Sequence, residues 1–207
     1  MPLPLWYQND FITYQIFLNM KTQFIILLFS VLTLNVFATG VPSIAFANNK
    51  AIIIKSNEWK SKVVDVEIKE ATGTIILSES LNIKKSDRKY NLKNLPDGQY
   101  TIEIADDLKI LKQQFYINKS EVVMSNEVET TYKPFITHNG NNLDVNLMTL
   151  GNPAFINITD NNNNIVYADK QDTSAVHKRY DISSLTEGTY TITVGIKGKS
   201  FSKDFTK

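Results

Sequence analysis

The chain matches itself when it is shifted by 90 residues, and this internal repeat limits the folds it can adopt. Residues 68–115 and 158–205 share ten identical positions without a gap, most of them apolar or turn residues. Similar residues extend the register back to Asn49 and Asn139. Self-similarity over a span of this size indicates duplication of one folding unit. We therefore expect two tandem copies of one small domain.

Apolar and polar residues alternate in short runs through both copies, a pattern typical of strands with one face on a core and one in water. In the first copy Tyr100, Ile102 and Ile104 alternate with Thr101 and Glu103. The strands expected in the first copy are 52–55, 63–69, 74–77, 89–92, 99–105 and 108–117. The second copy repeats the pattern at Phe155, Ile156, Ile158, Tyr190, Ile192 and Val194.

Turn-forming residues separate these runs. Segments 71–74 and 161–164 contain Gly or Asn, which accept the positive φ of hairpin loops. Segments 95–98 and 185–188 end in Gly and form a tight turn before the most regular strand. Neither copy shows an amphipathic helical pattern. The expected fold is all-β, with two tandem antiparallel β-sandwiches of immunoglobulin-like or fibronectin type.

The first 38 residues carry the pattern of an export signal. A basic start at Lys21 and the apolar run 24–37 precede a small-x-small site that ends at Ala38. We expect a cleaved signal peptide over 20–38, and we expect residues 1–19 to be a mis-assigned upstream extension. An uncleaved membrane anchor is the alternative, although the apolar run is short for a stable span.

The repeat also bears on the domain boundaries. A second small-x-small site ends at Ala47, but cleavage there would remove residues that match the opening strand of the second copy, 135–137. We therefore expect the earlier site to be used, with one domain over 39–118 and another over 133–207. Residues 119–132 are polar around one apolar patch, and we expect a linker there or a strand added to one copy.

The composition excludes several kinds of chemistry. The chain has no cysteine, which rules out disulfides, cysteine-ligated metals and thiol nucleophiles. Each domain must therefore be stabilised by its own apolar core. With 22 basic and 21 acidic side chains the net charge is +1, and the basic residues are not clustered. We expect no nucleic-acid partner, because phosphate binding needs a concentrated positive surface.

A recurring motif resembles a known family. The pattern Leu-x-x-Gly-x-Tyr occurs at 95–100 and again at 185–190, and the second occurrence is followed by a final segment, 203–207, that closes with Lys. This pattern resembles the C-terminal sorting domain of the type IX secretion system, and also related stand-alone exported domains of unknown function. The resemblance is greatest for the second copy, and it implies a bacterial β-sandwich that is exported. The first copy carries the same motif in the middle of the chain, where a sorting tag would have no use.

One loop has the spacing of a weak metal site. Asp160, Asn162 and Asn164 stand at i, i+2 and i+4, like the first ligands of a calcium loop. Ile165 occupies the position that should be Gly, and no Glu follows at the far end. A polar hairpin loop is the main interpretation, with calcium binding as the alternative. We expect no cofactor, no other metal and no catalytic residues.

Loop residues are the expected contact points with a partner. Trp59 is the one aromatic residue that the repeat does not explain, and it is either an exposed contact residue or a core plug. Asn57, Asn161 and Asn163 are the other contact candidates, and capture of a strand at a sheet edge is a further possibility. We expect a non-catalytic module in the periplasm, at the cell surface or outside the cell. It would bind an unknown protein or glycan, and it would have no membrane span after signal cleavage. The alternative function is a role in export, with the second copy as a sorting or anchoring domain.

Overall fold

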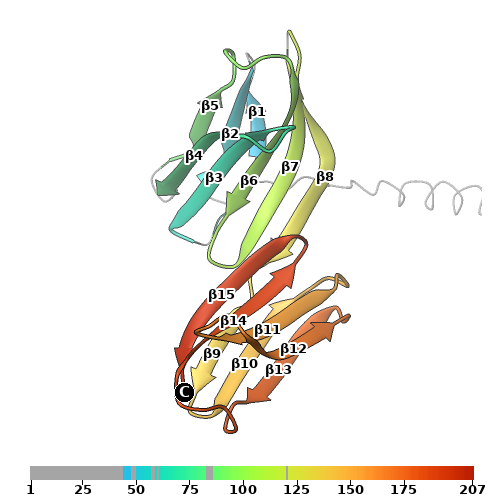
Figure 1. The fold of residues 1–207 in the computed structure, drawn as a ribbon. Helices are drawn as coiled ribbons and strands as arrows, with labels where there is room; N and C mark the ends of the chain where they lie inside the picture. Colours follow the sequence, from blue (N-terminus) through green and yellow to red (C-terminus); the bar gives the residue numbers. More distant parts are fainter. Residues whose placement is uncertain (1–43, 48–49, 57–58, 60, 83–85, 120) are drawn as a thin grey trace, which may run out of the picture. The chain divides into compact units, whose positions relative to one another are not determined.

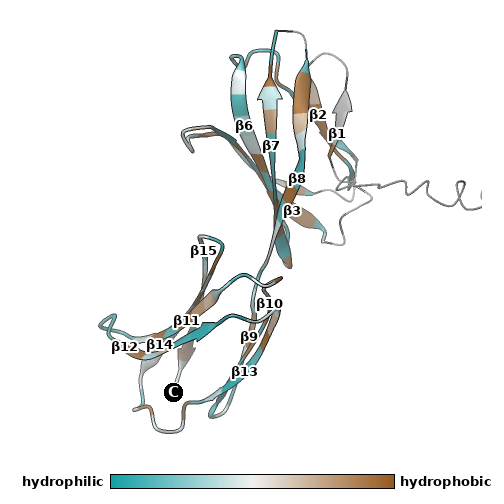
Figure 2. Cartoon of the chain, turned by 90° about the vertical axis from the view of Figure 1, so that its right-hand side faces the viewer, coloured by the Kyte–Doolittle hydropathy of each residue, from teal (hydrophilic) through white to brown (hydrophobic). Residues whose placement is uncertain are grey.

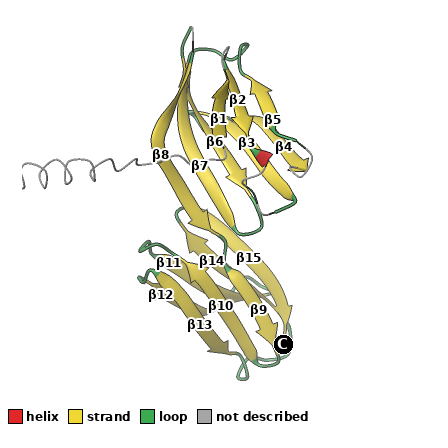
Figure 3. Ribbon diagram, turned by 180° about the vertical axis from the view of Figure 1, so that it is seen from behind, coloured by secondary structure: helices red, strands yellow, loops and turns green. Residues whose placement is uncertain are grey.

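The computed structural model describes residues 44–47, 50–56, 59, 61–82, 86–119 and 121–207, and these residues are all-β (Figure 1). The strands belong to one compact unit, Gly40–Lys207. Ser56 has 3₁₀ conformation and is the one helical position within the described residues. Figure 3 shows strands and loops almost throughout. No described helix has the length and apolar character needed to cross a membrane. The expected signal peptide, the extension before it and Asn57 lie outside the described residues.

The strands form four sheets, and every pair of neighbouring strands is antiparallel. The N-terminal sheets have the strand orders β1-β2-β5 and β4-β3-β6-β7-β8, and the C-terminal sheets have the orders β13-β10-β9 and β12-β11-β14-β15. Their bounds are β1 Ile44–Ala47, β2 Ala51–Ile54, β3 Val63–Glu70, β4 Ile75–Asn82, β5 Arg88–Asn91, β6 Gly98–Ala105, β7 Lys109–Ile117, β8 Val122–Tyr132, β9 Phe135–Asn139, β10 Asn142–Met148, β11 Ala154–Asp160, β12 Ile165–Gln171, β13 Ala175–Asp181, β14 Thr189–Ile196 and β15 Lys199–Thr206.

The N-terminal sheets share one apolar core, and the alternation predicted from the sequence determines which residues enter it. Ile102 and Ile104 on β6 are fully buried, whereas Glu103 between them points away from the core cluster. Ile52 and Ile54 on β2 enter the same cluster from the other sheet. Figure 2 shows the resulting mixture of apolar and polar residues along the strands. Each fully buried Ile stabilises the fold by about 1.5–3 kcal/mol relative to an exposed one.

The C-terminal sheets share a second core cluster. Ile192 and Val194 on β14 are fully buried, as the sequence predicts. The prediction for Phe155 is wrong: its side chain is 49% exposed, and Ala154 and Ile156 of β11 enter the core instead. The reason is the period of two in a strand, which allows either Phe155 or its neighbours to face inward but not both.

A tyrosine and a carboxylate connect the two sheets in each half of the structure. Tyr90 on β5 donates a hydrogen bond to Glu79 Oε1 on β4, with 2.6 Å between the oxygens. Tyr180 on β13 donates to Asp169 Oδ2 on β12 at 3.1 Å. Both tyrosines are buried, so each hydroxyl satisfies its hydrogen bond at the margin of a core.

Residues 119–132 are more than a linker, and this part of the domain prediction is corrected. Val122–Tyr132 forms β8, which pairs with β7 from Lys109 to Ile117. Val122, Met124 and Val128 pack against the N-terminal core. The apolar patch that the sequence shows in this segment therefore covers a sheet edge, which is the second of the two expected interpretations.

The gap-free register of the repeat fails in the opening strands. Ile52 pairs with Tyr90, and Leu143 pairs with Tyr180. The two tyrosines are 90 residues apart, but Ile52 and Leu143 are 91 apart. A constant offset of 90 would match Asp144 with Ile54, which is buried. The extra residue is needed because a shift of one residue moves every side chain of a strand to the opposite face of the sheet.

Candidate functional site

The loop with calcium-like spacing uses its carboxylate within the loop. Asp160 Oδ1 accepts hydrogen bonds from the backbone nitrogens of Asn162 at 2.9 Å and Asn164 at 2.8 Å, and Oδ2 accepts from Asn164 Nδ2 at 2.9 Å. These bonds, first of all the one from the Asn164 side chain, hold the pKa of Asp160 below its usual range. The geometry is that of an Asx-stabilised hairpin turn. No group of three His, Cys, Asp or Glu side chains that could hold a metal ion is found in the described part of the chain.

The remaining loop candidates differ in exposure. Asn161 and Asn163 are exposed, and Asn163 has a positive φ of 61°, a conformation that Asn tolerates in turns. Trp59 is only 9% exposed and belongs to the N-terminal core cluster. Its Nε1 has no hydrogen-bond partner, and Lys109 Nζ lies 5.7 Å from its ring centroid. Trp59 therefore plugs the core and does not present its ring to a partner.

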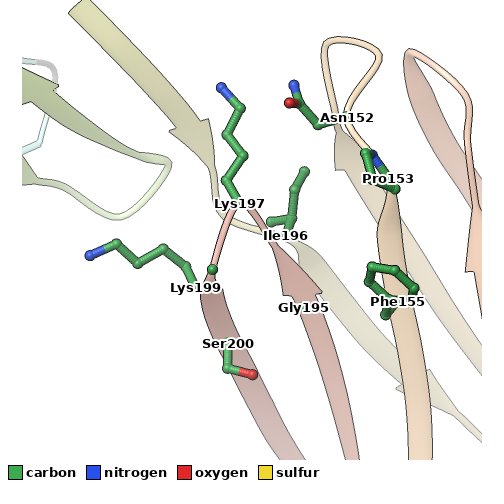
Figure 4. A pocket seen from close by; sticks show the side chains of 9 residues that line it. Asn152, Pro153, Phe155, Gly195, Ile196, Lys197, Lys199 and Ser200 are labelled. Carbon is green, nitrogen blue, oxygen red and sulfur yellow. The ribbon is translucent and has the colours of Figure 1, made fainter.

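A hollow of about 610 Å³ lies beside the β14–β15 hairpin (Figure 4). We call it the Phe155 hollow. Its lining residues are Asn152, Pro153, Phe155, Gly195, Ile196, Lys197, Gly198, Lys199 and Ser200. The volume lies in the range of small-ligand sites, about 300–1,000 Å³.

Strand register explains why this hollow exists. Phe155 on β11 pairs with Gly195 on β14, and Gly195 pairs with Ser200 on β15. Gly195 has no side chain, and Ser200 has a short one, so the sheet surface is low beside the exposed ring of Phe155. Lys170 pairs with Phe155 from β12, and its Nζ lies 5.9 Å from the ring centroid.

The charge on the lining of the Phe155 hollow is positive. Its nine residues include Lys197 and Lys199 and no carboxylate. Lys199 Nζ lies 2.8 Å from Glu103 Oε2. Lys197 Nζ lies farther from a carboxylate, at 4.0 Å from Glu129 Oε1. Lys197 also donates a hydrogen bond to the carbonyl oxygen of Thr130 at 3.0 Å.

A second hollow, of about 360 Å³, lies on the outward face of the β13-β10-β9 sheet. Arg179 donates two hydrogen bonds to Asp144, at 2.6 and 3.0 Å, and this pairing lowers the pKa of Asp144 and raises that of Arg179. His177 Nδ1 lies 2.8 Å from Asn146 Oδ1. These side chains bind one another across neighbouring strands, as polar pairs on a solvated sheet commonly do.

The fold of β2–β7 can now be compared with known proteins. Residues 47–118 match the family model of the secretion system C-terminal sorting domain. The match falls on the first half of the repeat, whereas the sequence places its strongest likeness to sorting domains in residues 133–207. No curated protein matches the chain. Among solved structures, a biofilm-associated protein (BSP domain) aligns with 76% of this chain at 19% identity and a TM-score of 0.27, and the alignment covers 27% of that protein's chain.

Sequence reasoning did not identify the Phe155 hollow. The alternation pattern places Phe155 among the core residues. The sequence of one strand does not show which of two neighbouring apolar residues faces outward. The useful signal is Gly195, which interrupts an otherwise regular strand where the first copy has Ala105. Glycine inside a strand often marks a close approach of backbone or ligand.

Proposed function

We propose that the protein is a non-catalytic exported module of two tandem immunoglobulin-like domains that contacts a partner outside the cytoplasm. The observation that carries this proposal is the presence of two separate core clusters, each built from its own two sheets. The first domain would run from 39 to 132, with β8 included, and the second from 133 to 207. Four antiparallel sheets in the described residues support an arrangement as two β-sandwiches.

Matching details in the two halves support duplication. Tyr100 stacks on Phe115 with ring centroids 5.5 Å apart, and Tyr190 stacks on Phe205 at 5.7 Å. The Tyr100 hydroxyl donates to the Pro96 carbonyl oxygen at 2.9 Å, and the Tyr190 hydroxyl donates to that of Thr186 at the same distance. A tyrosine bonded to backbone a few residues upstream is a feature of immunoglobulin-like sandwiches.

Two observations support export and a role without catalysis. The sorting-domain match over residues 47–118 fits a protein that is exported and displayed or released. In the two hollows His177 and Arg179 pair with Asn146 and Asp144, and Lys197 donates to the Thr130 carbonyl oxygen. Such static pairs suit a binding surface better than a site for proton transfer.

A second candidate function is an address within the export system, with the second domain acting as a sorting or anchoring tail. The Leu-x-x-Gly-x-Tyr motif at 185–190, which residues 95–100 share within the sorting-domain match, is the observation that favours it. This function predicts that the second domain is removed when the protein reaches its destination.

The intact mass of the mature protein decides between the two functions. The protein should be recovered separately from the medium and from washed cells of a bacterium with a type IX secretion system. A single species from about Thr39 to Lys207 in either fraction supports the two-domain contact module. A species that lacks residues 133–207 and occurs only outside the cell supports the sorting role. A chain that stays in the cytoplasm with its first 38 residues would overturn both.

A further inference from the structure

The backbone conformation and surroundings of position 195 do not require a glycine. A Cβ atom added to Gly195 would meet no atom closer than 3.9 Å, its φ is not in the left-handed region, and the pairings of β14 with β11 and β15 pass through it without a bulge. Glycine inside a strand lowers stability by about 0.5–1 kcal/mol relative to alanine. Neither a turn nor a close backbone approach requires it, and its effect on the structure is to leave the sheet surface open beside Phe155.

The Phe155 hollow combines an apolar floor with a polar rim. Phe155, Pro153 and Gly195 provide the floor, and the ring of Phe155 is 49% exposed. On the rim, Asn152 donates its side-chain nitrogen to the carbonyl oxygens of Thr149 and Leu150, which leaves its side-chain oxygen directed to other partners. The Ser200 hydroxyl can both donate and accept a hydrogen bond.

Positive charge distinguishes this rim from the second hollow. Lys197 lies on it, and Lys170 stands over the Phe155 ring with its ammonium group shared with Asp172 at 2.9 Å. Lys170 and Asp172 are both more than half exposed, so their pair is weak and leaves Lys170 available to an incoming anion. In the second hollow, by contrast, Arg179 donates two hydrogen bonds to Asp144, whose side chain is only 19% exposed.

We propose that the Phe155 hollow binds an acidic saccharide, with the C–H face of a sugar ring stacked on Phe155 above Gly195 and its carboxylate directed to Lys170. A pyranose has an apolar face and hydroxyl edges, which match the floor and the rim described above. The exposed and weakly paired ammonium group of Lys170 beside the Phe155 ring favours an anionic ligand over a neutral one. This inference rests on the proposed contact function and names its ligand class.

Affinity electrophoresis of the purified full chain tests the proposal, with polygalacturonate or neutral galactan cast into native gels. Wild-type protein should be retarded by polygalacturonate and much less by galactan. Phe155→Ala should weaken binding about tenfold or more, because it removes the stacking surface. Gly195→Val should weaken it similarly by filling the hollow, and the Cβ atom that it adds meets no atom closer than 3.9 Å. Lys170→Gln should weaken it a few-fold and reduce its dependence on salt.

Tyr116→Ala is the matched control, because Tyr116 is an aromatic residue on a strand with 50% exposure, close to the 49% of Phe155. It should bind like wild type, and thermal unfolding should show that all variants are folded. Equal loss in Phe155→Ala and Tyr116→Ala, or equal retardation by galactan, would overturn the proposal. If neither polymer retards the protein, the saccharide proposal is also overturned. A peptide would then be the occupant to test. The electrophoresis measures saccharide binding, and the intact-mass measurement tests export and processing. A failure of the saccharide proposal is therefore distinguishable from a failure of the proposed function.

Discussion

The tyrosine–carboxylate bond between the N-terminal sheets allows a quantitative test of what holds them together. Tyr90→Phe removes one hydroxyl and leaves the buried ring in place, since Tyr90 is 5% exposed. Glu79 loses the 2.6 Å hydrogen bond and keeps Arg88, whose Nε and Nη2 donate at 3.0 and 3.1 Å. A hydrogen bond to a charged group contributes about 1.5–3 kcal/mol. The Glu79 side chain is 29% exposed, so water replaces part of the lost bond and the expected cost is near the lower end, about 1.5 kcal/mol.

The cost should depend on pH in a defined direction. The hydrogen bond from Tyr90 is the largest influence on the pKa of Glu79, and together with Arg88 it holds that pKa below its usual value despite partial burial. A carboxylate with a lowered pKa in the folded state stabilises the protein above its unfolded pKa, about 4.3, and loses that contribution as the pH falls through the folded value. The difference between wild type and Tyr90→Phe should therefore be full at pH 7 and shrink below about pH 4.

Urea unfolding followed by fluorescence is the appropriate measurement. With a slope of about 1.5 kcal/mol/M, a loss of about 1.5 kcal/mol lowers the midpoint by about 1 M. Tyr116→Phe is the control, because its exposed hydroxyl should make no difference to the free energy of unfolding. The reasoning is refuted if Tyr90→Phe unfolds within about 0.3 M of wild type at pH 7, or if its deficit is unchanged at low pH. Tyr180→Phe should cost less, since its bond to Asp169 is longer at 3.1 Å.

Three further predictions follow from the cores and the turns. Ile192→Ala, at a fully buried position, should lower the free energy of unfolding by about 2–5 kcal/mol. Hydrogen exchange should show reduced protection of β14 and unchanged protection of β6. Equal loss of protection in both strands would contradict two separate folding units. Gly195→Ala should stabilise the protein by about 0.5–1 kcal/mol in the same urea assay, whereas Gly73→Ala should destabilise it by about 1 kcal/mol because Gly73 has a φ of +88°. Addition of calcium should leave the thermal unfolding midpoint unchanged, because the Asp160 oxygens already accept three hydrogen bonds; an upward shift that Asp160→Asn abolishes would restore the calcium interpretation.

Some parts of the structure follow from local sequence and others depend on contacts between distant residues. The alternation around Ile102 and Ile192 predicts both the strands and their buried faces, because side chains on a strand point to opposite sides in turn. The same reasoning fails at β11, where Phe155 and Ile156 are adjacent and equally apolar. Only the pairing of β11 with β14 places Ile156 inside and Phe155 beside Gly195.

The role of segment 119–132 also depended on tertiary contacts. A polar stretch with one apolar patch is compatible with a linker and with an edge strand, and the sequence leaves both open. Pairing with β7 decides for the strand, since it satisfies backbone groups at an edge and adds Val122 and Met124 to the core surface. Trp59 is a similar case: its ring is buried because the N-terminal core accepts it, not because of any neighbouring residue in the chain.

The sequence by itself determined the all-β class and the places of most strands and turns, because period-two alternation and turn-forming residues act over a few positions. Tertiary structure alone decided the one-residue offset of the opening strands, the addition of β8, the tyrosine–carboxylate bonds between sheets and the hollow beside Phe155. Each of these features joins residues far apart in the chain. Their positions relative to one another are fixed by strand register and core packing, which no short stretch of sequence encodes.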